Sequence, residues 1–326
     1  MSSRIALTLG DPRGIGPEIA AKVLQDLPVG AEVVTVGPAA LLDFLPGPHV
    51  EAGDAPAGYV RRRTAQWSER TIAYPVLGVD RVAAGLLVRA QVECAVRLAM
   101  AGDVDAIVTG PGEKLALREA GIPHPGHTEW LAELTGQPDA IMMLTDERLR
   151  VVLATTHMAL RDVPAALTRE RVERVGQVTH AALREWWGLS NPRLAVCALN
   201  PHAGEDGLFG DEDATVLAPA AAALNAEGPL PADTVFVRAL RGEFDAVLAP
   251  YHDVGMTAIK VAAFGKAVNV TLGLPIIRTA PDHGTAFDIA GQGVADPSSL
   301  HAAVTLAVQL AARRSGHPID TARAHA

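Results

Sequence analysis

The sequence has 326 residues, of which 49% are hydrophobic and 20% are charged. Such a chain forms two domains of about 150 residues each or one large α/β unit, and its composition favours a packed core over disorder. The 28 Lys and Arg residues against 37 Asp and Glu residues give a net charge of −9, which argues against a nucleic-acid partner or an anionic membrane surface. Cys94 and Cys197 lie far apart and outside any Cys-x-x-Cys pattern, which argues against a disulfide scaffold or a thiolate zinc site.

The apolar segments near the two ends of the sequence are too short or too polar for a membrane. Ile5–Leu9 is followed at once by Gly10-Asp11-Pro12, and residues 297–312 include Ser, His, Thr and Gln. A membrane span needs about 20 mainly apolar residues. We therefore expect a cytoplasmic protein with no membrane partner.

Short β-branched runs alternate along the chain with longer helical patterns. The expected strands are residues 5–9, 32–36, 106–109, 151–154, 194–199, 246–249 and 268–272. The expected helices are residues 18–27, 82–101, 128–135, 168–187, 212–227 and 298–313. This alternation predicts parallel sheets covered by helices, the α/β class. Because no clean linker is visible, we expect two domains that exchange chain segments, residues 1–125 with 265–326 and residues 126–264.

Polar clusters follow five of these expected strands. They begin at Gly10, Thr109, Thr155, Asn200 and Pro250. In open α/β sheets, ligands bind outside the carboxyl ends of the strands. The five clusters therefore predict one cleft that is lined by strand ends.

Three histidines occupy strand-end positions, namely His157, His202 and His252. A trio of neutral imidazoles with an open fourth position can hold catalytic zinc or a similar divalent ion. The alternative is that each histidine caps a strand or bonds backbone carbonyls. The residues alone leave both interpretations open.

Other polar residues near strand ends also have two interpretations. Thr128 and Glu129 suit the start of a helix, which leaves the neighbouring His127 unexplained. The glycine-rich residues 10–18 offer backbone N–H groups to an anion, although a structural turn is the simpler explanation. Three cations could hold a phosphate or a carboxylate or be solvated surface residues: Lys114, Lys260 and Arg278.

Residues 282–291 form a polar, glycine-bearing loop that is expected to run into a short helix. A carboxylate such as that of Asp288 could accept both hydroxyls of an adenosine ribose, the chemistry that favours NAD over its 2′-phosphorylated relative. The alternative is a surface turn that carries an acidic residue.

Together these motifs resemble the PdxA family, the 4-hydroxythreonine-4-phosphate dehydrogenases of vitamin B6 synthesis. The resemblance runs from Thr8 to about Gly293. It rests on residues 10–12, 14–18, 109–111, 126–129, 157 with 161–163, 200–205, 251–253, 269–275 and 278–279. The 283–291 segment is also similar to the adenosine-binding loop of isopropylmalate dehydrogenases, whose fold the family shares.

The resemblance implies a homodimer of two-domain α/β/α subunits, with active sites in the interdomain clefts and shared between subunits. It makes residues 1–125 with 265–326 the nucleotide side and residues 126–264 the metal-binding and dimerisation domain. The metal ligands that it implies are His157, His202 and His252, with zinc expected first and cobalt or magnesium as alternatives. The substrate contacts that it implies are His127, Thr128, Lys260, Asn269 and Arg278. The NAD contacts are expected at Gly284, Thr285 and Asp288.

The implied reaction is the NAD-dependent oxidation of the secondary alcohol of 4-phosphooxy-L-threonine, followed by loss of CO2 to give 3-amino-2-oxopropyl phosphate. A divalent ion beside the substrate hydroxyl lowers its pKa and stabilises the alkoxide that gives up hydride. Asp253, which is adjacent to His252, and Lys114 are the candidates for proton transfer.

The sequence departs from the common family pattern at three positions. Gly112 and Glu113 stand where the family usually has an aliphatic residue and Asn, and Val254 stands where it usually has Gln. A carboxylate at position 113 beside a phosphate site is unfavourable unless Lys114 neutralises it. Two alternatives therefore stay open. The first is a paralogue that oxidises a phosphorylated threonate or erythronate or a cis-dihydrodiol dicarboxylate, and the second is a binding protein without turnover.

Overall fold

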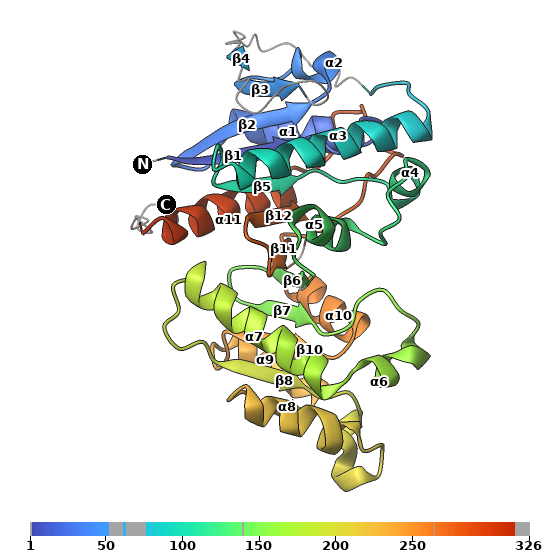
Figure 1. The fold of residues 1–326 in the computed structure, drawn as a ribbon, viewed down its shortest axis with the longest axis vertical. Helices are drawn as coiled ribbons and strands as arrows, with labels where there is room; N and C mark the ends of the chain where they lie inside the picture. The colour runs from blue at the N-terminus through green and yellow to red at the C-terminus, as the bar shows by residue number, and fades with distance from the viewer. Residues whose placement is uncertain (1, 52–60, 63–75, 139, 264, 317–326) are drawn as a thin grey trace. The chain divides into compact units, whose positions relative to one another are not determined.

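The computed structural model describes residues 2–51, 61–62, 76–138, 140–263 and 265–316. The chain divides into two compact units (Figure 1). The first is Met1–Pro138 with Leu274–Ala326, and the second is Asp139–Gly273. Compared with the expected boundaries, residues 126–138 thus belong with the first unit and residues 265–273 with the second.

The strands of the first unit lie in the order β4-β3-β2-β1-β5-β12. Their bounds are β1 (Ser3–Thr8), β2 (Ala31–Gly37), β3 (Pro48–Glu51), β4 (Arg61–Arg62), β5 (Ala106–Thr109) and β12 (Ile277–Pro281). Neighbouring strands are parallel, apart from the antiparallel pair β3 and β4. Parallel strands that are covered on both faces are buried along their whole length, as all four residues of β5 are.

Helices cover both faces of this sheet. They are α1 (Gly16–Gln25), α2 (Ala39–Leu42), α3 (Arg81–Met100), α4 (Lys114–Glu119), α5 (His127–Thr135) and α11 (Ser298–Arg314). α11 packs on β1, β5 and β12 and contacts α1, whereas α3 packs on β1, β2 and β5 and contacts α4 and α5. α3 begins where the Asp80 side chain accepts a hydrogen bond from Ala83 N, as is usual for an N-cap.

The strands of the second unit lie in the order β11-β6-β7-β10-β8-β9. Their bounds are β6 (Ile141–Thr145), β7 (Arg150–Leu153), β8 (Leu194–Cys197), β9 (Glu227–Leu230), β10 (Ala246–Ala249) and β11 (Val268–Leu272). The expectation of parallel pairing is wrong for β6, which runs antiparallel to both β7 and β11. The cause is a tight turn between β6 and β7, in which the Asp146 carboxylate accepts hydrogen bonds from the backbone N–H groups of Arg148 and Leu149.

The helices of the second unit include short irregular segments beside the α-helices. They are η1 (Leu160–Asp162), α6 (Val163–Ala166), α7 (Arg169–Glu185), η2 (Pro201–Gly207), η3 (Asp213–Leu217), α8 (Ala218–Ala223), α9 (Ala232–Leu240) and α10 (His252–Ala263). The expected long helix at 212–227 is therefore wrong in its last four residues, 224–227. α8 ends before Asn225, which has a positive φ of 50°, and β9 begins at Glu227.

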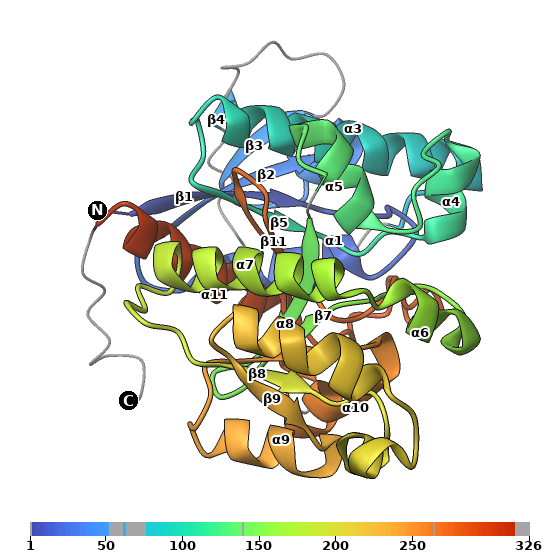
Figure 2. The same cartoon turned by 60° about the horizontal axis from the view of Figure 1, so that its bottom comes forward.

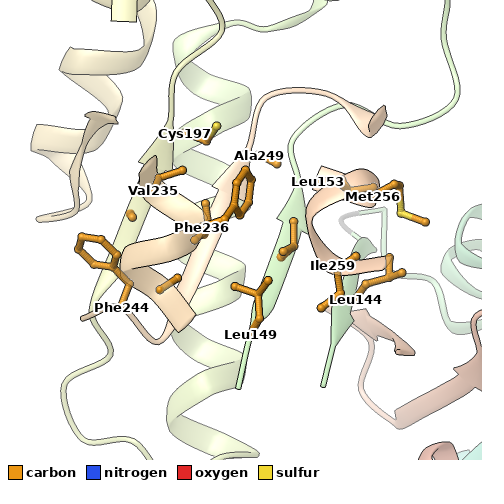
Figure 3. Packing of buried hydrophobic residues seen from close by; sticks show 14 of the residues in the cluster. Leu144, Leu149, Leu153, Cys197, Val235, Phe236, Phe244, Ala249, Met256 and Ile259 are labelled. Carbon is orange, nitrogen blue, oxygen red and sulfur yellow. The ribbon is translucent and has the colours of Figure 1, made fainter. Parts of the chain in front are cut away.

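Helices α7 and α8 lie on one side of this sheet and α9 on the other (Figure 2). The core beneath α9 and α10 joins side chains from four strands to apolar side chains of both helices, among them Val235, Phe236 and Ile259 (Figure 3). Within the described residues, no helix is both long enough and apolar enough to span a membrane. The α/β class that the sequence predicts is confirmed in both units.

Candidate active site

In the second unit, the three candidate metal ligands come from three adjacent parallel strands. β10 pairs in parallel with β7 on one side and with β8 on the other. His157 follows β7, His202 follows β8, and His252 is the first residue of α10, just after β10. Because the strands are parallel and adjacent, all three histidines leave the sheet at its carboxyl edge.

His157 and His252 lie together at this edge. Their ring centroids are 5.6 Å apart, and both line a cavity of about 340 Å³ together with Tyr251 and Asp253. His252 Nδ1 lies 2.6 Å from Asp253 Oδ1, and because a carboxylate only accepts, the Nδ1–H must donate. In the neutral ring, this bond leaves the lone pair on Nε2, which is the form that a metal-binding imidazole needs.

His202 lies in an unusual left-handed turn. The five consecutive residues 202–206 have positive φ angles, although only Gly204 is a glycine. Each non-glycine residue in the left-handed conformation costs roughly 1 kcal/mol. The turn therefore persists only where hydrogen bonds from surrounding residues hold it. The buried Asp213 carboxylate holds the start of this segment by accepting from Leu199 N at 2.8 Å and from Asn200 N at 3.0 Å.

The donor set at this edge fits a divalent ion in its chemistry but is incomplete among the residues that the structure describes. Two imidazoles are close together, and one of them has its tautomer fixed by a carboxylate. Within the described residues, however, no three His, Cys, Asp or Glu side chains gather closely enough to hold an ion. His202 therefore does not join the other two histidines in this structure.

In the first unit, a buried arginine is a separate candidate for binding an anion. Arg278 on β12 is 4% exposed, and its Nε and Nη2 lie 3.1 Å and 2.7 Å from Thr109 Oγ1, at the end of β5. Burial lowers the pKa of Arg278 to about 10, so the side chain stays charged at neutral pH. The sequence placed this cation near a strand end, and the structure places it within a strand.

His127 begins α5 in the same unit. Its Nε2 is buried and has no hydrogen-bond partner among the described residues. Burial, together with the positive charges of Arg278 and Lys114, lowers the pKa of His127 to about 3. The ring is therefore a neutral imidazole in a positively charged environment, with an unused polar atom. Thr128 follows it in the first turn of α5 and is partly buried.

Glu113 precedes α4 and is neutralised by arginines. Its Oε2 lies 2.5 Å from Arg13 Nη2 and 3.5 Å from Arg81 Nε. Arginines therefore meet the condition that the sequence set for Lys114, because the side chain of Glu113 turns toward the loop after β1. Lys114 itself is exposed at the start of α4.

The other two departures from the family pattern also have a structural context. A Cβ at Gly112 would lie 3.2 Å from His127 Cε1 and 3.4 Å from Val88 Cγ1, so a side chain there would press on His127. Val254 packs against the apolar core of the second unit, where an apolar side chain suits its surroundings.

The remaining predicted site residues are exposed or only partly buried. Lys260 lies exposed on α10, and Asn269 is a partly buried residue of β11. Gly284 and Asp288 are exposed, while the Thr285 carbonyl accepts a hydrogen bond from Ile15 N at 2.9 Å. Sequence reasoning missed Asp213 and the pairing of Arg13 with Glu113. Each depends on contacts between distant segments that no local pattern signals.

Comparison with known proteins finds relatives that match almost the whole chain. The family described as pyridoxal phosphate biosynthetic protein PdxA matches residues 50–307. A protein named 4-hydroxythreonine-4-phosphate dehydrogenase from Methylorubrum populi is 45% identical, and the match covers 95% of each chain. A relative of the same name from Geobacter metallireducens is 44% identical, over 94% of this chain and 95% of the relative.

Two solved structures extend the comparison. The 4-hydroxythreonine-4-phosphate dehydrogenase of Klebsiella pneumoniae is 40% identical, with a TM-score of 0.80 over 95% of this chain and 98% of that one. A terephthalate 1,2-cis-dihydrodiol dehydrogenase from Burkholderia xenovorans is 30% identical, with a TM-score of 0.65 over 95% and 98% of the two chains.

The two units define an α/β protein with polar side chains at the carboxyl ends of its strands. More narrowly, the chain belongs to the PdxA family.

Proposed function

We propose that this chain is a dehydrogenase that oxidises 4-phosphooxy-L-threonine with NAD in pyridoxal 5′-phosphate biosynthesis. The observation that carries the proposal is the 45% identity over 95% of both chains with a relative named for this activity. In the reaction, the secondary alcohol loses a hydride to NAD and a proton to a base. The resulting β-keto acid then loses CO2, and its carbanion takes up a proton to give 3-amino-2-oxopropyl phosphate.

The first unit supplies groups that suit an anionic substrate. Arg278 is a buried cation whose position is fixed by Thr109, so little side-chain freedom is lost when it binds an anion. His127 stays neutral and presents an unused Nε2, which can bond a polar group of the substrate. We assign Thr128, Lys260 and Asn269 as further substrate contacts and Lys114 as a candidate for proton transfer.

The second unit supplies the residues that would hold a divalent ion, namely His157, His202 and His252. We expect zinc first, with cobalt or magnesium as alternatives. Such an ion, when bound, lowers the pKa of the substrate hydroxyl and offsets negative charge on its oxygen. Asp253 orients the His252 ring through its bond to Nδ1, and its side chain is 85% exposed, so it is also open to exchange protons with water.

We further propose that the protein works as a homodimer with shared sites. One chain brings two of the three imidazoles together, so a ligand from a second copy would complete the set. On the nucleotide side, we assign Gly284, Thr285 and Asp288 to NAD. The exposed Asp288 carboxylate is free to accept the ribose hydroxyls.

A second candidate substrate is a cis-dihydrodiol dicarboxylate. The terephthalate 1,2-cis-dihydrodiol dehydrogenase at 30% identity favours it. A phosphorylated threonate or erythronate differs from the first substrate only near the amino group and would use the same anion contacts.

The test is NADH formation by the purified, zinc-loaded protein. 4-Phosphooxy-L-threonine is compared with its 2-hydroxy analogue and with a cis-dihydrodiol dicarboxylate, each before and after chelation. We expect chelator-sensitive turnover that is strongest with the amino substrate. Turnover of only one of the other two compounds would reassign the substrate, and no turnover with any of them would contradict the dehydrogenase assignment.

The metal assignment has a separate test in Asp253→Asn. An amide side chain can accept from His252 Nδ1 but carries no charge, so we expect zinc affinity to fall by about tenfold in titration calorimetry. Unchanged affinity and turnover would remove Asp253 from the site.

A further inference from the structure

In the first unit, Arg13 connects two loops that are far apart in sequence. Its Nε and Nη2 donate to the two oxygens of Asp11 at 3.0 Å and 2.7 Å, in a bidentate pair. Nη2 also lies 2.5 Å from Glu113 Oε2, in the segment before α4. Asp11 is fully buried, so this arginine is held by one buried and one partly buried carboxylate. These bonds raise the pKa of Arg13.

A third loop, which contains Phe287, contacts the same guanidinium. The Arg13 Cζ lies 5.1 Å from the centroid of the Phe287 ring, within the range of a cation–π contact. Two residues further along the chain, Ile15 N donates to Thr285 O at 2.9 Å. The backbone is also close here, because a Cβ at Gly14 would lie 2.6 Å from Thr285 O. The loop after β1 therefore holds residues 285–287 by one backbone bond and one side-chain contact.

The end of the 282–295 segment is held separately by α1. The buried Glu18 carboxylate accepts from Gly293 N at 3.1 Å and from Ala295 N at 2.7 Å, and Lys22 Nζ donates to the carbonyls of both residues. This second anchor does not involve Arg13. The part of the segment that depends on Arg13 is therefore the short stretch around Phe287 and the adjacent Asp288.

The charges of this cluster exclude one simple role for Arg13. Its guanidinium already faces two carboxylates, so it is not a free cation that awaits a phosphate. Its planar fork instead satisfies Asp11 and Glu113 while one face covers an aromatic ring, a combination that lysine cannot reproduce. Phe287 is 44% exposed, so the ring is covered only in part.

We propose that Arg13 is a positioning residue for NAD, acting through Phe287 to hold the stretch that carries Asp288 in its binding conformation. Glu113 contributes by fixing the guanidinium over the ring. The gain in affinity comes from ordering the loop before the cofactor arrives, which lowers the entropy cost of binding. This inference rests on the proposed function, because it takes Asp288 as the ribose contact.

The test measures the Kd for NAD by titration calorimetry on the zinc-loaded protein, together with hydrogen–deuterium exchange of residues 282–291. For Arg13→Gln we expect a Kd raised by about tenfold, which corresponds to the loss of one cation–π contact and one charged hydrogen-bond network. Exchange of the 282–291 peptide should rise. The KM for the phosphorylated substrate and kcat at saturating NAD should stay within about twofold, because the anion contacts lie elsewhere.

Phe287→Leu is a second variant, needed in case Arg13→Gln fails to fold. It removes the contact between the ring and the guanidinium but keeps the ion pair between Arg13 and Asp11. It should also raise the Kd for NAD, and the double variant should be no worse than the poorer single variant, since both changes remove the same contact. Arg193→Gln is the matched control. Arg193 also binds one carboxylate, that of Asp245, through two nitrogens, but it lies in the second unit and should leave NAD binding unchanged.

The outcomes separate this inference from the proposed function. Wild-type protein that binds no NAD would overturn both. Wild-type binding with equal affinity in Arg13→Gln, or strictly additive losses in the double variant, would overturn only the role of Arg13.

Discussion

The guanidinium of Arg278 and the hydroxyl of Thr109 meet between two parallel strands, with Nη2 and Oγ1 2.7 Å apart. β12 pairs with β5 in a register that sets Arg278 beside Ile107 and Thr279 beside Val108. The arginine therefore reaches along the sheet to the last residue of the neighbouring strand. In the proposed function, this fixed and buried cation is a contact for the anionic substrate.

Replacing this cation by a smaller one tests its role. In Arg278→Lys the ammonium cannot make the forked contact with Thr109, and burial lowers the pKa of a lysine more readily. We expect the KM for the phosphorylated substrate to rise by about 10- to 100-fold, with a smaller change in kcat. Steady-state kinetics at saturating NAD measures this. Thr109→Val, which keeps the arginine but removes its acceptor, should raise the KM less, and an unchanged KM in both variants would contradict the role.

His127 predicts a pH dependence of stability. Its pKa is about 3 in the folded protein and about 6.5 in an unfolded chain. Below pH 6.5 the unfolded chain therefore binds a proton that the folded protein does not, and the free energy of unfolding falls as the pH decreases toward 3. The slope from this one group is at most about 1.4 kcal/mol per pH unit.

The measurement is urea unfolding of wild type and His127→Gln between pH 7 and pH 4. The variant should lose stability less steeply with decreasing pH, because glutamine does not titrate. His301→Gln is the control variant, because it makes the same chemical change at a partly buried residue of α11. Parallel curves for wild type and His127→Gln would show that His127 is not held neutral.

Asp213 predicts a large stability effect from a small change. The carboxylate accepts from two backbone N–H groups, whereas the single oxygen of an amide would turn its NH2 group toward one of them. We expect Asp213→Asn to lower the free energy of unfolding by about 2–3 kcal/mol. Urea unfolding should show this loss, and Asp211→Asn, at an exposed neighbour, should be close to neutral. Equal stability of both variants would mean that Asp213 does not hold the turn that carries His202.

Cys197 should be chemically inert in the folded protein. Burial, with a smaller contribution from the charge of Asp213, raises the pKa of its thiol to about 12. Burial also raises the pKa of the Cys94 thiol. Because the thiolate is the reactive form, a disulfide reagent at pH 8 should label neither residue until urea is added, and then both. Rapid labelling of the native protein at Cys197, detected by peptide mass spectrometry, would contradict the buried environment.

Local patterns predicted some strands to the residue and missed others. The expected bounds 106–109, 246–249 and 268–272 coincide with β5, β10 and β11. β12 escaped prediction because Arg278 interrupts its apolar run, and the Thr109 hydroxyl that accepts from the buried guanidinium lies far away in the sequence. β6 escaped because the two methionines and the leucine in its middle are not β-branched, which leaves only Ile141 and Thr145 to favour a strand.

In the candidate site, too, the features that depend on local sequence could be predicted, whereas those that depend on distant contacts could not. The histidines could be placed at strand ends because each follows a short buried run, and that depends only on local sequence. The neutralisation of Glu113 could not be predicted, because its partner Arg13 is 100 residues away and the adjacent Lys114 is the nearer cation in the chain. The left-handed turn at His202 was likewise beyond prediction, because residues with side chains rarely adopt it without tertiary support.

The division of the chain into units also sets an order for their folding during synthesis. Residues 139–273 are continuous and contain a complete six-stranded order with its helices, so this unit can close as soon as it has left the ribosome. The first unit begins earlier but lacks β12 and α11 until residues 274–316 emerge. Its β1 and β5 strands, which α11 covers, must therefore wait with apolar surface open to solvent. The first unit is therefore the first to begin synthesis and the last to complete its fold. Its exposed apolar strands need protection from aggregation during the time in which the ribosome translates the second unit.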